Sequence, residues 1–196
     1  MAVIQMLPAI QPLLLGPEAR MRAQGLGLLS SLREQGVLNT QTVVAPLVAL
    51  TLDPQSAANR TRAWDEIRAL HQRYPSVVVS NAVPGILMAH KLQTGALPRD
   101  GTYRQLEAMY QACLCASVRS RREFLEALAR RASASDAGAG AGADAGPVVG
   151  GDRLDAAALR FLAAVVCALP FTKEEEGLTV VYFVNRRVSL HTPTLD

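Results

Sequence analysis

The segment of residues 36–71, GVLNTQTVVAPLVALTLDPQSAANRTRAWDEIRALH, constrains the fold more than any other part of the chain. Gly36 ends one helical pattern, and Asn39 or Thr40 can cap the next one. The stretch that follows is apolar almost all round: it contains Val43, Val44, Leu47, Val48, Leu50 and Leu52. A helix with apolar residues on nearly every side must be buried on most sides.

Asp53-Pro54 separates this helix from a second, amphipathic one. The Asp53 side chain can accept hydrogen bonds from the free N–H groups at a helix start, and Pro54 suits the first helical position, where no N–H is needed. We therefore predict that the second helix starts here. Its apolar stripe, at helical spacing, consists of Ala63, Trp64, Ile67, Leu70 and His71.

Pro46 lies inside the first of the two helices, where a proline removes a hydrogen bond and kinks the helix. A helix pair with a proline in its first helix, an aspartate at the turn and an arginine early in the second is the pattern of a HEAT repeat. Such a unit cannot bury its apolar faces alone and needs stacked neighbours. The sequence therefore predicts an all-α fold, a HEAT-type α-solenoid of stacked antiparallel helix pairs.

The remaining chain divides into further helical patterns and one low-complexity stretch. We expect HEAT-like repeats over residues 1–131, a flexible Ala/Gly-rich linker over 132–151 and a closing helix pair of the same solenoid over 152–192. The GAGAGAD run in the linker follows no strand and lacks the lysine of a phosphate-binding loop, so it does not predict a nucleotide site. Helices are expected over residues 1–15, 18–35, 76–93, 102–116 and 118–131.

Thr172 and Glu175 match a capping box at the start of the last helix.

The helical periodicity also predicts which side chains face the core. The three cysteines, Cys113, Cys115 and Cys167, fall in apolar stretches and are expected to be small core residues, which favours a reducing compartment. Other expected core residues include Met21, Leu28, Leu29, Leu32, Trp64, Val118, Phe124, Leu125, Leu128, Leu178, Val181, Tyr182, Asn185 and Val188.

Composition excludes several classes of protein. Apolar residues make up 49% of the chain and charged residues 19%, which is typical of a folded protein rather than a disordered one. The net charge of +3 is far below that of a nucleic-acid-binding tail. Residues 1–15 lack a basic start and are interrupted by Pro8 and Pro12, so they make a poor signal peptide and are too short to span a bilayer. We expect no membrane partner.

Three stretches in register resemble one known family. Residues 35–63, QGVLNTQTVVAPLVALTLDPQSAANRTRA, are similar to the most recognisable stretch of the cohesin-loading subunit family, the Nipped-B-like or sister chromatid cohesion protein 2 proteins. Residues 119–128, RSRREFLEAL, resemble that family's basic helix. Residues 169–190, LPFTKEEEGLTVVYFVNRRVSL, resemble its closing helix. The resemblance runs from about Met21 to Leu190 and is interrupted by the linker.

The resemblance implies a nuclear protein that acts in sister chromatid cohesion during the cell cycle. Members of the family are large HEAT solenoids that load the cohesin ring onto chromatin and pair with a tetratricopeptide-like partner. The implied partners are therefore cohesin complex subunits, double-stranded DNA and that loader partner. The family's partner-binding N-terminal segment has no counterpart here, so we expect this chain to correspond to the far C-terminal piece. The alternative is an unrelated HEAT-repeat adaptor, such as a transport or phosphatase-type scaffold.

Arginines supply the candidate DNA-binding residues. On the helix over 118–131, positions 119, 122, 126 and 130 share a face, so three arginines can line up along a phosphate backbone while Glu126 interrupts them. An ordinary solvated helix face is the alternative interpretation. The candidates are Arg119, Arg121, Arg122, Arg130 and Arg131, with Arg186 and Arg187 as a second pair.

The sequence offers no catalytic or metal-binding pattern. The histidines, His71, His90 and His191, are scattered, and no His-x-x-x-His or Cys-x-x-Cys spacing is present. The carboxylates of residues 174–176 are explained by helix capping. We therefore expect a non-catalytic scaffold without cofactor or metal.

Overall fold

The computed structural model describes residues 6–92, 100–133, 154 and 156–189, and this part of the chain contains helices and no strand. The all-α, solenoid-like fold predicted from the sequence is confirmed. In chain order the helices are α1 (Met6–Leu14), α2 (Ala19–Glu34), α3 (Thr40–Thr51), α4 (Ala57–Arg73), α5 (Pro75–Leu92), α6 (Asp100–Met109), η2 (Tyr110–Leu114), α7 (Val118–Ser133), α8 (Ala156–Ala168) and α9 (Glu174–Ser189). The π-helical turn η2 continues α6 directly.

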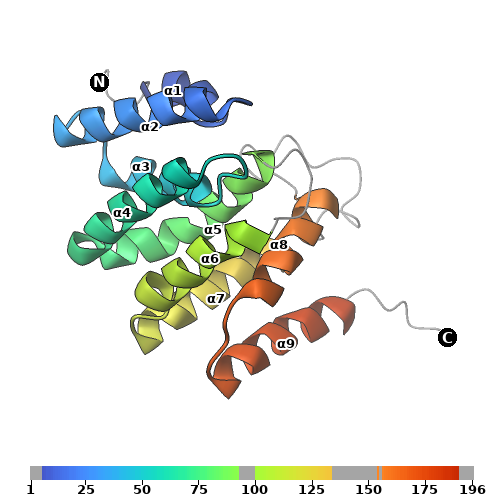
Figure 1. The fold of residues 1–196 in the computed structure, drawn as a ribbon. Helices are drawn as coiled ribbons and strands as arrows, with labels where there is room; N and C mark the ends of the chain where they lie inside the picture. Colours follow the sequence, from blue (N-terminus) through green and yellow to red (C-terminus); the bar gives the residue numbers. More distant parts are fainter. Residues whose placement is uncertain (1–5, 93–99, 134–153, 155, 190–196) are drawn as a thin grey trace, which may run out of the picture.

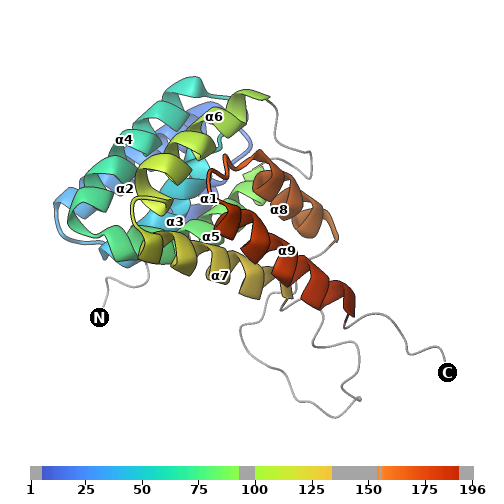
Figure 2. The same cartoon turned by 90° about the horizontal axis from the view of Figure 1, so that it is seen from below.

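The helices stack in chain order. Figure 1 shows α1 and α2 at one end, α3 to α7 in the middle and α8 and α9 at the other end. Helix α3 packs on α4 and most extensively on α5, and α5 in turn packs on α7. Helix α9 lies beside α7, as the view from below shows (Figure 2). Each helix pair therefore covers the apolar face of its neighbours, as a repeat stack requires.

Helix α3 forms the centre of the core. Its residues 46–51 are all buried, as are Val43 and Val44, so the helix predicted to be apolar all round is enclosed on nearly all sides. Gly85 of α5 lies directly against α3: a Cβ atom there would stand 2.5 Å from the Val48 Cβ and 2.7 Å from the Ala45 carbonyl oxygen. The absence of a side chain at residue 85 therefore sets how closely α3 and α5 approach.

The junction between α2 and α3 follows the sequence prediction. Gly36 has a φ of +71°, a backbone conformation that glycine adopts without a steric penalty. Its N–H donates to the Arg33 carbonyl and that of Val37 donates to the Leu32 carbonyl, at 2.9 Å each. These two bonds form a Schellman motif that ends α2. Asn39 then caps α3, because its Oδ1 accepts from the Gln41 N–H at 3.0 Å.

The predicted start of α4 is wrong by one turn. Ser56, not Asp53, is the N-cap residue, and its Oγ accepts from the Asn59 N–H. The Asp53 carboxylate does accept from the N–H groups of Gln55 and Ser56, but these precede the helix. The Asp53 carboxylate instead accepts a hydrogen bond from the Arg22 guanidinium. Arg22 is buried, which the pattern of apolar residues did not indicate.

The predicted capping box of α9 also has a different acidic member. Glu176, not Glu175, reaches back to the start of the helix, where its Oε2 accepts from the N–H groups of Thr172 at 2.8 Å and Lys173 at 3.4 Å. Glu176 is fully buried, whereas Glu175 is exposed. Because α9 begins at Glu174, Glu176 is its third residue, the position from which a glutamate can reach back.

Several predicted core positions are exposed. Phe124, Leu125 and Leu128 of α7 are buried as predicted, and Trp64 is half-buried at the edge of the core. Periodicity identifies an apolar face but not whether a neighbour covers it, and α9 lies at the edge of the stack, where its outer face has no described helix over it. The exposed positions are Leu28, Cys167, Val118, Leu178, Val181, Tyr182 and Asn185.

Some predictions lie outside the described residues. These are residues 134–151 of the predicted flexible linker, residues 1–5 of the first helix, His191 and the side chain of Val188. Ala132 and Ser133, which the sequence assigned to the linker, instead form the end of α7. Within the part that is described, no helix is both long enough and apolar enough to cross a membrane.

Candidate interaction surfaces

The predicted arginine row lies on the exposed side of α7. Arg119 and Arg122 are 88% and 80% exposed. Each forms an ion pair one turn along the helix: Arg119 Nε with Glu123 Oε1 at 2.8 Å, and Arg122 Nε with Glu126 Oε1 at 2.7 Å. Arg130 is also exposed and donates to the Glu126 carbonyl at 3.3 Å. The row is accessible, and two of its three charges are partly balanced by neighbouring carboxylates.

Arg121 has a different environment from the row. Its side chain is 11% exposed, and its Nε lies 2.6 Å from the Oε1 of buried Glu176, so this ion pair joins α7 to α9. Burial, together with Cys115 and Glu176, raises the pKa of Tyr110, which keeps the phenol neutral beside the pair. The Cys115 thiol also donates to Glu176 Oε1 at 3.9 Å. The position of Arg121 fits helix packing better than contact with an external phosphate.

The remaining candidates are placed less centrally. Arg131 is half-buried near the end of α7. Arg186 and Arg187 belong to α9, but their side chains lie outside the described side chains. The structure brings Arg119, Arg122 and Arg130 onto one face of one helix and does not bring Arg121 into that face.

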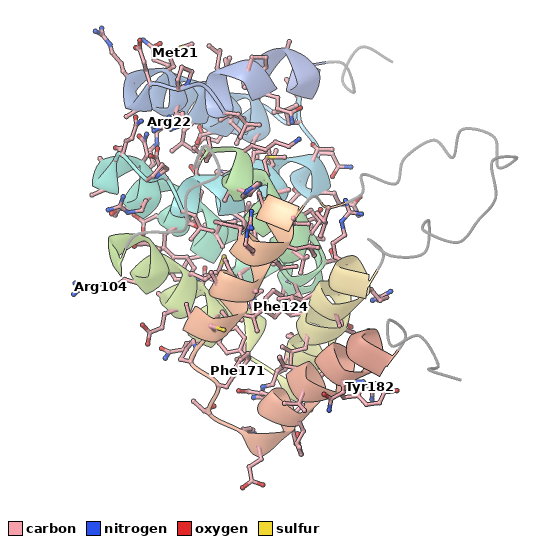
Figure 3. All side chains as sticks on the ribbon, turned by 90° about the vertical axis from the view of Figure 1, so that its right-hand side faces the viewer. Met21, Arg22, Arg104, Phe124, Phe171 and Tyr182 are labelled. Carbon is pink, nitrogen blue, oxygen red and sulfur yellow. The ribbon has the colours of Figure 1, made fainter. Side chains whose placement is uncertain are left out.

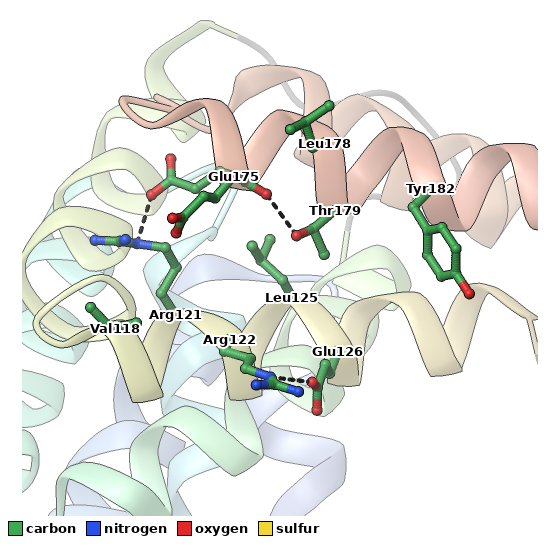
Figure 4. A pocket seen from close by; sticks show the side chains of 10 residues that line it. Val118, Arg121, Arg122, Leu125, Glu126, Glu175, Leu178, Thr179 and Tyr182 are labelled. Carbon is green, nitrogen blue, oxygen red and sulfur yellow. Dashed lines mark hydrogen bonds and ion pairs between the residues drawn. The ribbon is translucent and has the colours of Figure 1, made fainter.

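A groove between α7 and α9 is a surface that the sequence did not predict as a site. It has a volume of about 530 Å³. Figure 4 shows Leu125 of α7 directed toward α9, where Thr179 faces it, with Tyr182 at one end; Leu178 of α9 also lines the groove. Its charged margin includes the Arg122–Glu126 pair and Glu175. The sequence signal was present, because Leu178 and Tyr182 stand out as an apolar stripe, but the stripe was interpreted as core.

A second feature missed from the sequence is the buried polar cluster around Asp53. Arg22 lies in the α1–α2 layer at the opposite end of the molecule from Tyr182 (Figure 3). Its guanidinium binds Asp53, and Asn59 Nδ2 donates to the same carboxylate at 2.9 Å. Burial alone would raise the pKa of Asp53, but hydrogen bonds from Arg22, Asn59 and Gln55 outweigh it and lower the pKa below its ordinary value. The groups of this cluster are buried and bind one another, so the cluster stabilises the packing of the helices.

The two described histidines, His71 and His90, do not form a metal site with other side chains of the described residues. Burial lowers the pKa of His71, and His90 stacks at a tilt on Phe161 with ring centroids 5.2 Å apart. Among the described residues, no three or more His, Cys, Asp or Glu side chains are grouped so that they could hold a metal ion.

The stacked helix pairs define the class of protein as helical-repeat-like, with an exposed arginine row and an open groove on its surface. The family model for the sister chromatid cohesion C-terminus matches residues 2–187, nearly the whole chain, and the chain therefore belongs to this family. Its role accordingly lies in sister chromatid cohesion, and the resemblance seen in the sequence is confirmed. No curated protein and no solved structure shows a significant match to the chain.

Proposed function

We propose that this chain is the C-terminal part of a cohesin-loading subunit and acts in the nucleus as a non-catalytic scaffold. In this role it helps to load the cohesin ring onto chromatin, contacts cohesin subunits and duplex DNA, and works together with the tetratricopeptide-like loader partner. The observation that supports the proposal most strongly is membership of the sister chromatid cohesion family over residues 2–187. The solenoid-like fold agrees with a scaffold, because stacked repeats present extended surfaces.

The DNA contact is assigned in this proposal to Arg119, Arg122 and Arg130. Arg130 lies eleven positions after Arg119, about 16 Å along the helix axis at roughly 1.5 Å per residue. Two of these arginines form intrahelical ion pairs, which are weak at exposed positions, so phosphates can replace the carboxylates at low cost. Arg121, Arg131, Arg186 and Arg187 are secondary candidates, and Arg121 is the weakest because Glu176 already holds it.

The first experiment measures binding of the purified chain to a duplex DNA oligonucleotide over a salt series. Changing Arg119, Arg122 and Arg130 together to alanine should weaken binding and flatten the salt dependence by up to about 0.9 log units per lost phosphate contact. Changing Glu123 and Glu126 to glutamine should strengthen binding, because this removes the two carboxylates that compete with phosphate.

The matched control removes three exposed arginines on other helices, Arg68, Arg104 and Arg160. This variant has the same net charge as the α7 triple variant. If both triple variants lose affinity equally, only the overall charge matters and the assignment to α7 is wrong. A chain that does not bind DNA at low salt would remove DNA from the proposal.

The second experiment tests the cohesin contact independently of DNA. The immobilised chain is incubated with purified cohesin subunits, one at a time and as the assembled complex, in the presence of nuclease. We expect retention of the complex or of at least one subunit. Retention of none would contradict the scaffold proposal for this part of the loader.

A further inference from the structure

A buried polar cluster joins the start of α7 to the start of α9, and its members are Tyr110, Cys115, Arg121 and Glu176. The π-helical turn η2 positions the first two, because its last bond runs from the Cys115 N–H to the Tyr110 carbonyl at 2.7 Å. Turns of this kind occur frequently at functional sites. The Cys115 thiol donates to Glu176 Oε1 at 3.9 Å, and Arg121 Nε lies 2.6 Å from the same oxygen.

Two donors in this cluster lack a good acceptor. The Tyr110 hydroxyl and Arg121 Nη1 are both buried, and neither forms a hydrogen bond of ordinary geometry with a described residue. Both side chains approach the Cys115 sulfur instead, which is a weak acceptor. Tyr110 is 1% exposed and its ring packs edge-on against Phe124 and Phe171, so its hydroxyl has no route to solvent. Buried donors without an acceptor are uncommon in folded proteins and require an explanation.

Cys115 differs from the other two cysteines of the chain. It is half-buried in the bend between η2 and α7, where a small molecule can reach its sulfur. Cys113 is buried, and burial raises its pKa to about 11, which keeps it an inert thiol. Cys167 is exposed on α8, as an ordinary surface thiol is. Of the three, Cys115 combines partial exposure with a carboxylate and two buried donors beside its sulfur.

We propose that Cys115 is a site of oxidation, at which hydrogen peroxide converts the thiol to a sulfenic acid that the surrounding side chains retain. The sulfur attacks one peroxide oxygen, so an S–O bond forms while the O–O bond breaks, and the sulfur loses two electrons. The thiol proton passes to the Glu176 carboxylate and from there to the leaving hydroxide, which departs as water. One thiol and one peroxide thus give one sulfenic acid and one water.

The sulfenic acid supplies the acceptor that the cluster lacks. Its oxygen is a stronger acceptor than sulfur and can accept from the Tyr110 hydroxyl and from Arg121 Nη1, while its O–H can donate to Glu176. The group is neutral, so it adds no charge beside the Glu176 carboxylate. A second oxidation would give a sulfinate and place two anions together, which is unfavourable in a buried cluster. We therefore expect oxidation to stop at the sulfenic acid.

The test exposes the full chain to hydrogen peroxide and then removes the peroxide with catalase. After increasing delays the chain is unfolded in urea with dimedone, a carbon nucleophile that captures sulfenic acids, so burial in the folded chain does not limit labelling. Peptide mass spectrometry measures the label at each cysteine. We expect the label at Cys115 to last longest and to exceed that at Cys167, although Cys167 is more exposed. More label at Cys167 than at Cys115 would overturn the proposal.

Two variants test whether the cluster retains the sulfenic acid. Tyr110→Phe removes the buried hydroxyl and keeps the ring, and Arg121→Lys removes Nη1 and keeps a positive charge beside Glu176. Each should shorten the lifetime of the sulfenic acid at Cys115 about fivefold, which corresponds to about 1 kcal/mol for one lost hydrogen bond. Tyr74→Phe is the matched control, since Tyr74 is 47% exposed, and it should leave the lifetime unchanged.

Circular dichroism checks that each variant is folded, and the comparison of the cysteines in the wild type depends on neither variant. Two further results would overturn the proposal. The first is a lifetime in both Tyr110→Phe and Arg121→Lys equal to that of the wild type, which would mean that these donors do not hold the sulfenic acid. The second is conversion of Cys115 directly to a sulfinic acid or to a disulfide with Cys113, because no sulfenic acid would then be retained.

Discussion

Arg22 of α2 and Asp53, which follows α3, form a bidentate ion pair inside the core. Arg22 Nε lies 2.8 Å from Asp53 Oδ2, and Arg22 Nη2 lies 2.8 Å from Oδ1. Both side chains are fully buried. Arg22 Nη1 also donates to the Gly16 carbonyl at 2.6 Å. One guanidinium therefore ties the α1–α2 turn to the α3–α4 turn, two turns that are more than thirty residues apart.

The first prediction concerns the loss of one partner of this pair. Asp53→Ala should cost about 3–5 kcal/mol of the free energy of unfolding, because it leaves a buried guanidinium without its counter-charge. Arg22→Met combined with Asp53→Ala should cost less than Asp53→Ala alone, since no uncompensated charge remains. Urea unfolding followed by circular dichroism measures both. A loss below about 1 kcal/mol for Asp53→Ala would show that the pair contributes little.

The second prediction concerns pH. The pKa of Asp53 is lower in the folded chain than its ordinary value of 3.8, so the unfolded chain binds this proton more readily. The stability that Asp53 contributes is therefore complete at neutral pH and is lost as the pH falls below about 4. The difference in unfolding free energy between the wild type and Asp53→Asn should be constant above about pH 5 and shrink below about pH 4.

Urea midpoints at several pH values test this second prediction. Comparison with Asp53→Asn is essential, because His71 also has a lowered pKa and makes its own contribution to acid destabilisation in both proteins. A difference that grows on acidification would contradict the sign assigned to Asp53.

The third prediction uses two glycines with opposite surroundings. Gly85→Ala should destabilise the fold by about 1–3 kcal/mol, because its methyl group would overlap Val48 and the Ala45 carbonyl. Gly177→Ala should instead stabilise it by up to about 1 kcal/mol, since Gly177 is helical and a Cβ there has no atom within 4 Å. Thermal and urea melts of the two variants should shift in opposite directions. Equal shifts would mean that the close contact of α3 and α5 is not rigid.

The fourth prediction separates two adjacent glutamates. Glu176→Ala should cost about 3 kcal/mol, because it leaves Arg121 without its counter-charge and removes the acceptor for the Thr172 and Lys173 N–H groups. Glu175→Ala should change stability by less than about 0.5 kcal/mol, since that side chain is exposed. Amide hydrogen exchange at Thr172 and Lys173 should accelerate only in Glu176→Ala. Faster exchange in Glu175→Ala instead would support the capping box first expected from the sequence.

The sequence was sufficient to predict the helix pair at the centre of the fold. The features that identified it are local: Gly36 requires a left-handed turn, Asn39 caps the next helix, and a helix that is apolar on all sides must be enclosed. Such signals act within a few residues and do not depend on the remaining chain.

The sequence was not sufficient where a residue's role depends on a distant partner. Nothing near Arg22 in the sequence indicates Asp53, which lies 31 residues away, and an arginine is ordinarily expected at the surface. The same limit explains Glu176, whose partner Arg121 comes from another helix. It also explains why the apolar stripe of α9 was predicted to be core, since the periodicity of a stripe is the same whether a neighbouring helix covers it or leaves it exposed.

The candidate DNA-binding residues illustrate the same distinction. Their spacing correctly placed Arg119, Arg122 and Arg130 on one exposed face, because that follows from helix geometry alone. The inward direction of Arg121 could not be foreseen, since it depends on where α9 lies.

The close approach of Gly85 to Val48 also restricts how this protein can vary over time. Loss of volume at position 48 would not by itself admit a larger residue at position 85, because the Ala45 carbonyl oxygen would still stand 2.7 Å from the new Cβ atom. A side chain at position 85 becomes tolerable only when the backbones of α3 and α5 also move apart. The spacing of two central helices is thus inherited together with the glycine at position 85, and a substitution at position 48 alone does not release it.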